Sequence, residues 1–332
     1  MEAKVTIVVP IYNVEKYVSK CLNSLINQTY KYIEIWAIDD GSPDNSKDVV
    51  ERFSKKDPRV KLILKENGGY GSVLEYAISR ITTPYFLVCD PDDWLSPDAI
   101  EVLYTRAQQY DLDLVVGDKY NVYVGDEKNK KYVETFSKKI NLSPDKVYSD
   151  KQSIQKFSFG YVSPHAKLYK TKCTRNIIFP HKVSYTDFIL YIVSLAYVKK
   201  VMYVNKGLAF YLIDRPGNTT TNKNPETINK YLVVWNYTYK QLEKIDGNLD
   251  YLYSRLFYQI KYILSQYKDL TNHNFDDQYI YNIWAALKKL RKQKSSLLNV
   301  ESNNLKSKIL IEGLLSNNYY KITTKLYVNK FA

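Results

Sequence analysis

The sequence predicts an α/β fold in which a mostly parallel sheet is flanked by helices and followed by a mainly helical C-terminal region. Apolar, β-branched runs alternate with helix-patterned segments through the first 90 residues. A group of polar residues follows the end of each apolar run. From about residue 225 onward the pattern is helical and rich in Tyr, Leu and Lys. These three observations indicate a sheet-based domain and a helical appendage.

The first part of the chain alternates regularly between the two patterns. The expected strands are 5–9, 33–38, 60–64 and 85–89, and the expected helices between them are 14–27, 46–56 and 71–81. Apolar residues recur at helical spacing in each helix, and Ser46 is the expected N-cap of the second. Because helices of this length connect parallel strands by right-handed crossovers, the four strands are expected to run parallel.

The pattern after residue 110 is less regular. Residues 114–124 alternate as strands do, 163–172 indicate a loop that enters a strand, and 184–198 indicate a buried helix with a polar start. Residues 201–213 are expected to form a strand, a turn and a second strand. The segment 214–225 is the expected junction, so the predicted domains are 1–220, which is α/β, and 221–332, which is helical.

Composition narrows the possible functions. The three cysteines form no CxxC pair and the three histidines have no HExxH spacing, which argues against a disulfide framework and a zinc site and favours a reducing cytoplasm. The N-terminus lacks the pattern of a signal peptide, and no apolar run reaches the ~20 residues of a membrane-spanning helix. The net charge is +13, and ten Lys or Arg against two Glu follow residue 284. This basic end could bind an anionic membrane or nucleic acid, or it could simply be a lysine-rich helix face exposed to solvent.

Polar side chains follow each of the four strands that are expected to be parallel. In such sheets ligands bind beyond the carboxyl ends of the strands. Carboxylates there suit a hard cation such as Mg²⁺ or Mn²⁺, although turn capping is the simpler explanation for any one of them. The residues are, in chain order, Tyr12-Asn13, Asp39-Asp40, Asn67-Gly68-Gly69 and Asp90, Asp92 and Asp93.

Several segments in register resemble the successive motifs of glycosyltransferase family 2. They are "VVPIYN", "AIDDGSPDNS", "ENGGYGSVLEYAI" and "FLVCDPDDWL", with "SPHAKLY", "YTD" and "RPGNT" further on. The resemblance covers roughly residues 4–220, and its later features are similar to bacterial capsule, exopolysaccharide and teichoic-acid enzymes. It implies the GT-A fold and a metal-dependent, inverting transfer from a nucleotide sugar, above all a UDP-sugar. The acceptor would be a hydroxyl of a cell-surface glycan, a lipid-linked or a protein-linked acceptor.

The resemblance also assigns roles to residues of the donor site. It implies that Asp92 binds Mn²⁺ or Mg²⁺ and that Asp90 contacts the ribose or a metal-bound water, whereas Asp93 caps the next turn or joins the site. The nucleobase would lie against two further residues, Pro10 and Tyr12.

Other donor contacts follow from the same resemblance. Asp40 would accept the imide N–H of the base, and Asp39 would support its loop. Gly68 would lie near the nucleotide, although a tight turn alone explains a Gly-Gly pair. The Gly-Gly-x-Gly run does not have the spacing of a dinucleotide-binding fingerprint.

The later motifs imply a base and cations. Asp187 in "SYTD" matches the catalytic base of the family, although an acid at a helix start is also favoured by the macrodipole. Lys167 and Arg215 would neutralise diphosphate or acceptor charge. Ala166 stands where family members often have Asn, and His165 contacts the acceptor or is structural.

Two other classes of function compete with a transferase. A sugar nucleotidyltransferase would require a Gly-rich basic loop after the first strand, which "PIYNVEKYV" does not provide. A non-enzymatic basic protein that binds membranes or nucleic acid would leave the polar strand ends unexplained. We therefore expect an enzyme of the cytoplasm or the inner membrane face, without a nucleic-acid partner. Its C-terminal region would contact the acceptor, the membrane or a second copy of the chain.

Overall fold

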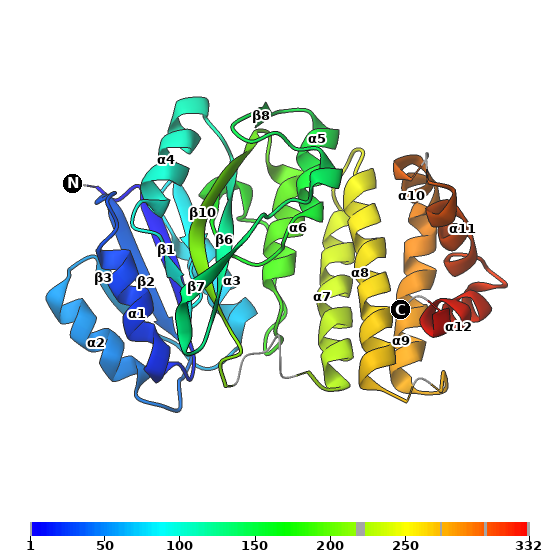
Figure 1. Ribbon diagram of the computed structural model, residues 1–332, viewed down its shortest axis with the longest axis horizontal. Coiled ribbons are helices and arrows are strands. Elements are labelled where there is room, and N and C mark those ends of the chain that lie inside the picture. The colour runs from blue at the N-terminus through cyan, green and yellow to red at the C-terminus, as the bar shows by residue number, and fades with distance from the viewer. Residues whose placement is uncertain (1, 217–222, 273, 302–303, 331–332) are drawn as a thin grey trace. The chain divides into compact units, whose positions relative to one another are not determined.

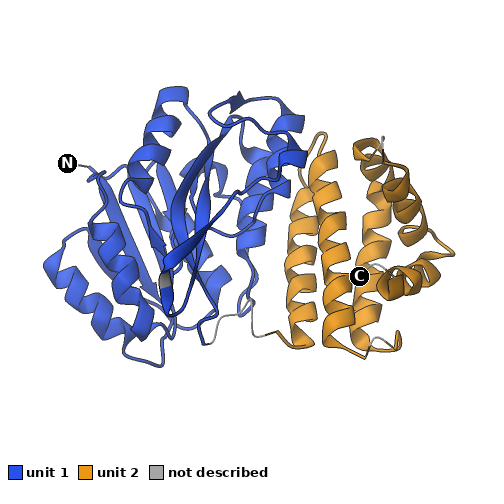
Figure 2. Cartoon of the chain, in the orientation of Figure 1, with its two compact units in different colours: residues 1–218 blue, residues 219–332 orange. Residues whose placement is uncertain are grey.

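The computed structural model describes residues 2–216, 223–272, 274–301 and 304–330. The chain forms two compact units, residues 1–218 and 219–332 (Figure 2). The expected domain boundary at residue 220 and most of the "RPGNT" segment lie outside the described residues. Among the described helices, none combines the length and the apolarity that crossing a membrane requires.

Unit 1 is built on a ten-stranded sheet (Figure 1). Its strands are β1 (Val5–Ile11), β2 (Ile33–Asp39), β3 (Val60–Leu64), β4 (Tyr85–Val88), β5 (Trp94–Leu95), β6 (Leu114–Tyr123), β7 (Asp126–Val133), β8 (Val147–Tyr148), β9 (Lys167–Lys170) and β10 (Val201–Ile213). The main order is β3-β2-β1-β4-β9-β6-β10-β5, with β7 beside β6 and β8 beside β10. Strands β1 to β4 are parallel, as predicted, and so is the pair β6 and β10. The remaining pairs are antiparallel, so the sheet is mixed.

Helices connect the strands of unit 1. They are α1 (Glu15–Ile26), α2 (Ser46–Lys56), α3 (Tyr70–Arg80), α4 (Ala99–Tyr110), α5 (Lys151–Lys156) and α6 (Asp187–Tyr197). Helices α1, α2 and α3 each connect consecutive parallel strands, which confirms the crossovers that the sequence predicts. The α/β class and the helical C-terminal region are thus both present.

The predicted strand, turn and strand over 201–213 is wrong, because these residues form the single strand β10. Its register against β6 shifts between Tyr203 and Gly207 and again between Gly207 and Ala209. A β-bulge absorbs extra residues in this way while the strand continues. A Cβ on Gly207 would lie 2.3 Å from the ring of Tyr120, so close packing requires glycine within this strand.

Ser46 is not the N-cap of α2, although the helix begins there as predicted. Its hydroxyl instead accepts a hydrogen bond of 3.0 Å from the backbone N–H of Val14. This contact ties the start of α2 to the segment that follows β1. Helix α4 and the polar strand β7 were not predicted at all.

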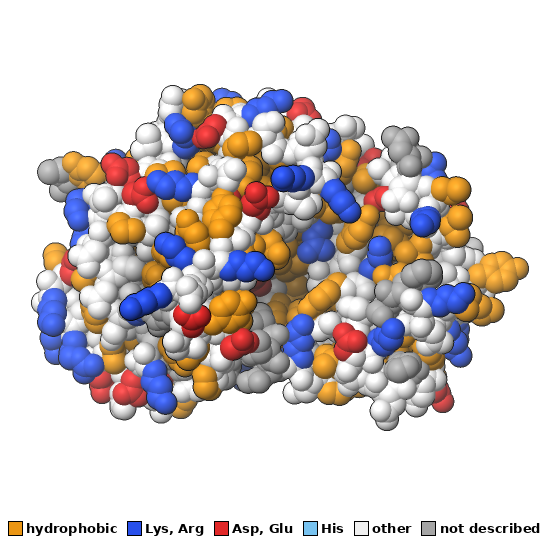
Figure 3. Space-filling view, in the orientation of Figure 1, with side chains coloured by type: hydrophobic (Ala, Val, Ile, Leu, Met, Phe, Trp, Pro, Cys, Tyr) orange, Lys and Arg blue, Asp and Glu red, His pale blue; other side chains and the backbone are white. Residues whose placement is uncertain are grey.

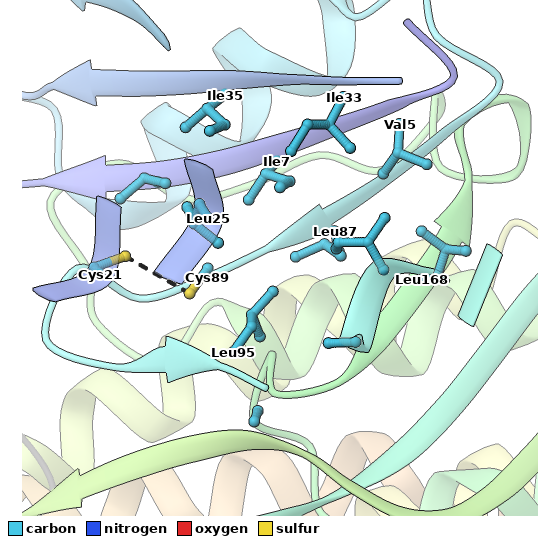
Figure 4. Close-up of a cluster of buried hydrophobic side chains, with 14 of the residues drawn as sticks. Val5, Ile7, Cys21, Leu25, Ile33, Ile35, Leu87, Cys89, Leu95 and Leu168 are labelled. Carbon is cyan, nitrogen blue, oxygen red and sulfur yellow. Dashed lines mark hydrogen bonds between the residues drawn. The ribbon is translucent and has the colours of Figure 1, made fainter. Parts of the chain in front are cut away.

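The core of unit 1 lies between the sheet and its helices (Figure 4). Ile7 of β1 is in register with Ile35 of β2 and with Leu87 of β4, and all three side chains are buried. Cys21 of α1 and Cys89, just after β4, bring their sulfur atoms within 3.7 Å of each other. Apolar packing therefore fixes the strands up to the point where their polar ends begin.

Unit 2 is helical. Its helices are α7 (Glu226–Leu242), α8 (Asp250–Leu270), α9 (Gln278–Leu290), α10 (Lys294–Val300), α11 (Leu305–Leu314) and α12 (Tyr320–Lys330). Trp235 of α7 is fully buried and donates its ring N–H to the carbonyl of Leu256 in α8. The basic C-terminal segment forms two separate helices, α11 and α12, in its last part.

Candidate active site

The polar ends of β1 to β4 meet at one edge of the sheet because the four strands are parallel. Tyr12, directly after β1, is 50% exposed, whereas Pro10 is buried within the strand. The backbone N–H of Asp40 donates to the carbonyl of Ile11, 2.9 Å away. The backbone N–H of Asn13 donates to the hydroxyl of Ser42. The segments after β1 and β2 are therefore held together.

Asp40 organises the loop after β3. Its carboxylate accepts hydrogen bonds from the backbone N–H groups of Gly68, at 3.0 Å, and Gly69, at 2.7 Å. It also pairs with the ammonium of Lys65. Gly69 has a φ of +80°, which favours glycine at this position. The first role of Asp40 in this structure is thus to close the loop near Gly68.

Asp39 has an open acceptor atom. One carboxylate oxygen accepts the backbone N–H of Ser42 at 2.8 Å. The other oxygen is buried and has no hydrogen-bond partner among the described residues. Since an unpaired buried polar atom is costly, this oxygen is suited to receive an N–H or O–H of a ligand. The sequence assigned Asp39 only to loop support.

The three carboxylates after β4 have different partners. Asp90 accepts a hydrogen bond of 2.8 Å from the hydroxyl of Tyr70. Asp92 forms an ion pair with Arg215. Asp93 is the most buried of the three, and its partners are His165 and a backbone N–H.

Asp93 and His165 lie close to Asp90. One Asp93 oxygen lies 2.6 Å from Nε2 of His165, and the other accepts the N–H of Leu212 at 2.8 Å. Asp90, Asp93 and His165 each present a ligand atom within 4.8 Å of the others. Two carboxylates and an imidazole form a suitable donor set for a divalent cation such as Mn²⁺. Asp92, which the sequence predicts as the metal ligand, forms an ion pair with Arg215 in this structure.

Burial changes the acidity of these groups. It raises the pKa of Asp90 to about 7, and the negative charge of Asp92 contributes in the same direction. Burial also raises the pKa of Asp93 and lowers that of His165. Carboxylates whose charge is this costly without a partner fit a site that receives a cation.

Asp187 begins α6, as the sequence predicts. Burial raises the pKa of its carboxyl to about 6, while the backbone N–H of Phe188 and the charge of Lys167 favour the ionised form. Thr186 beside it has a buried hydroxyl that finds no hydrogen-bond partner within the described part of the chain. A carboxylate with a pKa near 6 is ionised at neutral pH and basic enough to accept a proton.

Two lysines lie near Asp187. Lys167, at the start of β9, is fully buried, and burial lowers the pKa of its ammonium to about 7. Lys119 of β6 is also buried, with a pKa lowered to about 8 for the same reason. Both ammonium groups contact Ser163. The sequence pattern did not single out Lys119, because it is one lysine in an alternating strand.

The chain is similar to known proteins in sequence and in fold. Residues 6–177 match the model of Glycosyl transferase family 2. The chain belongs to glycosyltransferase family 2. This assignment confirms the family that the motifs resemble and makes the protein a glycosyltransferase.

Two curated pneumococcal proteins are similar to this transferase. The glycosyltransferase GlyA of Streptococcus pneumoniae serotype 4 is 32% identical over 221 residues, which cover 64% of this chain and 31% of GlyA. The glycosyltransferase GlyG of the same organism is 31% identical over 214 residues, which cover 64% of this chain and 71% of GlyG. The chain therefore spans less than a third of GlyA but most of GlyG.

Solved structures share the fold. S. aureus TarS 1–349, in complex with UDP-GlcNAc, has a TM-score of 0.72 and 16% identity, and the match covers 98% of this chain and 92% of that chain. The mannosyltransferase PcManGT from Pyrobaculum calidifontis, in complex with GDP-Man and Mn²⁺, has a TM-score of 0.55 and 14% identity, over 99% and 88% of the two chains. The likeness to TarS confirms the GT-A-like sheet with its helical C-terminal region.

The carboxylates of the candidate site do not line the surface hollow beside the loop after β3. A hollow of about 350 Å³ lies beside the loop after β3, where Lys65, Gly68 and His181 form part of its wall. None of the acids after β4, nor Asp187, belongs to that wall. The candidate site is therefore defined by its charged groups and by its buried acceptor atoms that lack a hydrogen-bond partner in the described chain.

Strained backbone accompanies the expected site residues of the transferase. Four residues that are not glycine have positive φ within two positions of these residues: Asn13, Ala166, Tyr185 and Asp214. They lie next to Tyr12, Lys167 and Arg215 and two positions before Asp187. Left-handed backbone costs roughly 1–3 kcal/mol per residue and is often retained where it positions functional groups. The φ of +52° at Ala166 is a conformation that Asn would tolerate more readily than Ala.

Proposed function

We propose that this transferase moves a sugar from a nucleotide sugar, specifically a UDP-sugar, to a hydroxyl of a glycan, lipid-linked or protein-linked acceptor with inversion. The observation that carries the proposal is the edge of the parallel sheet. Asp39, with its unpaired oxygen, ends β2, and Asp90 and Asp93 follow β4; both strands pair with β1. His165 completes the cluster of ligand atoms with Asp90 and Asp93. The UDP-GlcNAc and GDP-Man bound by structures of the same fold support a nucleotide-sugar donor.

The donor base would occupy the edge formed by β1 and β2. Tyr12 offers an exposed ring for stacking, next to the rigid Pro10. Asp40 holds the loop that presents Gly68 and retains acceptor capacity toward the imide N–H. The unpaired oxygen of Asp39 is a second acceptor for that N–H.

A divalent cation, Mn²⁺ or Mg²⁺, would be held by the carboxylates after β4. Asp90, Asp93 and His165 have ligand atoms close together, and Asp92 becomes available if Arg215 turns to the diphosphate. When bound, the cation would neutralise the charge that develops on the leaving diphosphate. Arg215 would add a second positive charge to the same group.

The base of the reaction would be Asp187. An ionised carboxylate at the start of α6 would take the proton of the attacking acceptor hydroxyl as the new glycosidic bond forms. Attack on the face opposite the leaving diphosphate inverts the anomeric centre. Lys167 helps to keep Asp187 ionised in this role.

The test is slow hydrolysis of UDP-sugars in Mn²⁺ without an acceptor, following a thermal-shift screen of nucleotide sugars. The wild type should release UDP from at least one of them. Asp92→Asn and Asp93→Asn should each lose this activity and weaken UDP binding in Mn²⁺ while remaining folded. Asp246→Asn, a change at an exposed position in unit 2, serves as the matched control.

A different product would reveal a different enzyme. Release of pyrophosphate from UTP and a sugar phosphate, without hydrolysis of any nucleotide sugar, would instead support a nucleotidyltransferase. Full activity of both Asp92→Asn and Asp93→Asn would remove the metal site from the proposal.

We further propose that unit 2 docks on an anionic membrane surface that carries the acceptor. Helices α11 and α12 expose large apolar side chains, led by Leu305 (71% exposed) and Ile309 (63%). Tyr319, Ile322 and Leu326 are exposed in the same region. Figure 3 shows hydrophobic and basic side chains side by side over these helices. Apolar residues among lysines are typical of surfaces that bind at a membrane interface.

Charge favours a membrane over a second copy of the chain as the occupant of this surface. Residues 305–330 contain five lysines and one glutamate. Two copies that meet through this surface would bring their lysines together, whereas anionic lipid headgroups attract them, by roughly 1 kcal/mol per Lys near the bilayer. A homo-oligomer through other surfaces is compatible with this arrangement.

A further inference from the structure

Lys119 and Lys167 are buried in unit 1 to a degree that is unusual for lysine. Lys167 is 1% exposed and Lys119 is 8% exposed. Lysine is almost never fully buried unless its charge is paired. These residues lie on β6 and on β9, which are adjacent antiparallel strands.

Neither ammonium group has a carboxylate partner among the residues that the structure describes. The Nζ atom of Lys167 donates to the carbonyl of Ser163, and that of Lys119 lies 3.4 Å from the hydroxyl of the same serine. Both partners are neutral. The nearest acids, including Asp187 and Asp93, act on the lysines through space without a direct ion pair.

Aromatic rings form much of the remaining surroundings. The ammonium of Lys167 lies 4.8 Å from the ring centre of Tyr191. That of Lys119 lies 4.5 Å from the ring centre of Tyr211 and 5.3 Å from that of Tyr161. Cation–π contacts favour a positive charge but do not neutralise it. Tyr161 is 53% exposed, so Lys119 lies close to solvent beneath an exposed ring.

Two neighbouring buried cations oppose folding. Both ammonium groups contact Ser163, so their positive charges lie close together and repel each other. An apolar side chain of similar length would fill either position without this cost. A structural role alone therefore does not explain the pair, whereas an anion of a bound ligand would compensate both charges.

We infer that Lys119 and Lys167 form an anion site beside Asp187 that binds a phosphate or carboxylate group of a substrate. The anion has two possible sources: the diphosphate of the donor, or an acidic group on the acceptor. The inference rests on the proposed function for the role of Asp187. It adds Lys119 to the site and specifies that the substrate group next to Asp187 carries a negative charge.

The experiment uses inorganic phosphate as the probe, at constant ionic strength, and follows the thermal unfolding of the full chain. Phosphate should raise the unfolding temperature of the wild type with saturation. Lys119→Met and Lys167→Met should each lose at least tenfold in phosphate affinity. Lys131→Met, at an exposed position on β7, should behave as the wild type does. Lys119→Arg, which keeps the charge, should retain phosphate binding.

The stability of the free proteins is a second readout that a structural role would not produce. Without phosphate, Lys119→Met should unfold at a higher temperature than the wild type because it removes an unpaired buried charge. A lower unfolding temperature for Lys119→Met, or equal phosphate shifts in all variants, would overturn the inference. If Lys119→Met does not fold, phosphate binding by Lys167→Met and Lys119→Arg decides.

A final arm identifies the source of the anion. Phosphate binding is measured again with UDP and Mg²⁺ at saturation. Loss of the phosphate effect assigns the site to the donor diphosphate, and its persistence assigns the site to an acidic acceptor. Both outcomes support an anion site. These measurements do not depend on turnover, so a wild type that binds phosphate but hydrolyses no nucleotide sugar would refute the proposed function alone.

Discussion

The two units differ in where they bury charge. Within the described part of the chain, every buried residue with a titratable acid, ammonium or imidazole group belongs to unit 1. The buried polar side chains of unit 2 are only Thr, Ser and Gln. The charged set is Glu34, Asp39, Asp40, Asp93, Asp113, Asp118, Lys119, His165 and Lys167.

The buried charges of unit 1 fall into two kinds. Asp118 is saturated, because it accepts from the hydroxyls of Tyr132 and Tyr203 and from the N–H of Thr135. Asp39 and the lysines beside Asp187 lack such complete neutralisation. The first kind serves the fold, whereas the second kind lies where substrates would bind. Among the described residues, buried charge that is not fully paired is therefore confined to unit 1, the unit in which we propose that the chemistry takes place.

Backbone strain follows the same division. Among described residues other than glycine, eight of the nine with positive φ lie in unit 1, and Phe275 is the one in unit 2. The following predictions test whether chemistry and stability are separated between the units in this way.

The largest effect is expected at Asp187. Asp187→Asn should reduce turnover by a factor of ~10²–10⁴, which is the usual contribution of a positioned base. UDP affinity should change little, since the carboxylate faces the acceptor hydroxyl in the proposed mechanism. Asp246→Asn in unit 2 is the control. Loss of UDP binding with intact turnover would move Asp187 to the donor site.

The pH dependence of the wild type tests the same residue. A base must be ionised, and the pKa of Asp187 is raised to about 6, so kcat/KM should fall about tenfold per pH unit below that value. The raised pKa means that the native state holds this proton more tightly than the unfolded state does. Ionised Asp187 therefore costs stability above pH 6, and Asp187→Asn should unfold at a higher temperature than the wild type at pH 8 but not near pH 4.

The next effect compares equal core deletions in the two units. Leu256→Ala in α8 and Leu87→Ala in β4 each remove a buried leucine and should cost about 2–5 kcal/mol of unfolding free energy. Donor hydrolysis per folded molecule should be unchanged by Leu256→Ala. It should fall in Leu87→Ala, because β4 positions Asp90 and the acids after it. Equal losses of hydrolysis in both variants would contradict the separation of roles.

A smaller effect is expected at the exposed surface of unit 2. Full-length protein should float with vesicles that contain anionic lipid and should not float with neutral vesicles. Leu305→Ser with Ile309→Ser should weaken this binding at least ~10-fold, since each removes apolar area worth about 1.5–3 kcal/mol when buried.

The control for the flotation experiment is Leu64→Ser, which alters an exposed leucine of unit 1. It should float as the wild type does. Binding that is indifferent to lipid charge and to the Leu305 and Ile309 substitutions would leave this surface to another partner.

The smallest effect concerns strain at Lys182, an exposed residue with a φ of +56°. Lys182→Gly should stabilise unit 1 by about 0.5–1 kcal/mol, because glycine adopts this conformation without a Cβ penalty. Chemical denaturation measures the change. Destabilisation would show that the lysine side chain contributes more than its backbone costs.

The predictable part of the fold lies where local pattern and tertiary structure agree. Strands β1 to β4 and their helices were predicted because each strand is apolar and each helix is amphipathic. β7 was missed because its sequence, "DEKNKKYV", is polar and forms a strand only by pairing with β6. β10 was misread because the glycine of a packed bulge resembles the glycine of a turn.

The candidate site shows the same limit. The acids that directly follow strands were predicted from their position together with the resemblance to the family motifs. The pairing of Asp93 with His165 joins residues 72 positions apart, and no local pattern indicates it. The burial of Lys119 could not be predicted without knowing which face of β6 is covered by the rest of unit 1. Partners that are distant in sequence are thus the part that only the fold reveals.

The thiol pair beneath the sheet edge makes the opening of that edge measurable. The Cys89 thiol is buried next to Cys21 and directly precedes Asp90, and its pKa is raised well above the usual range. A thiol-specific reagent would therefore modify the less buried Cys173 first and reach Cys89 only when the strand end separates from α1. The modification rate of Cys89, measured separately for each cysteine by mass spectrometry, would report how often the carboxylates after β4 lose the support of α1. A ligand that tightens this edge would lengthen the interval between such events even if no product were formed.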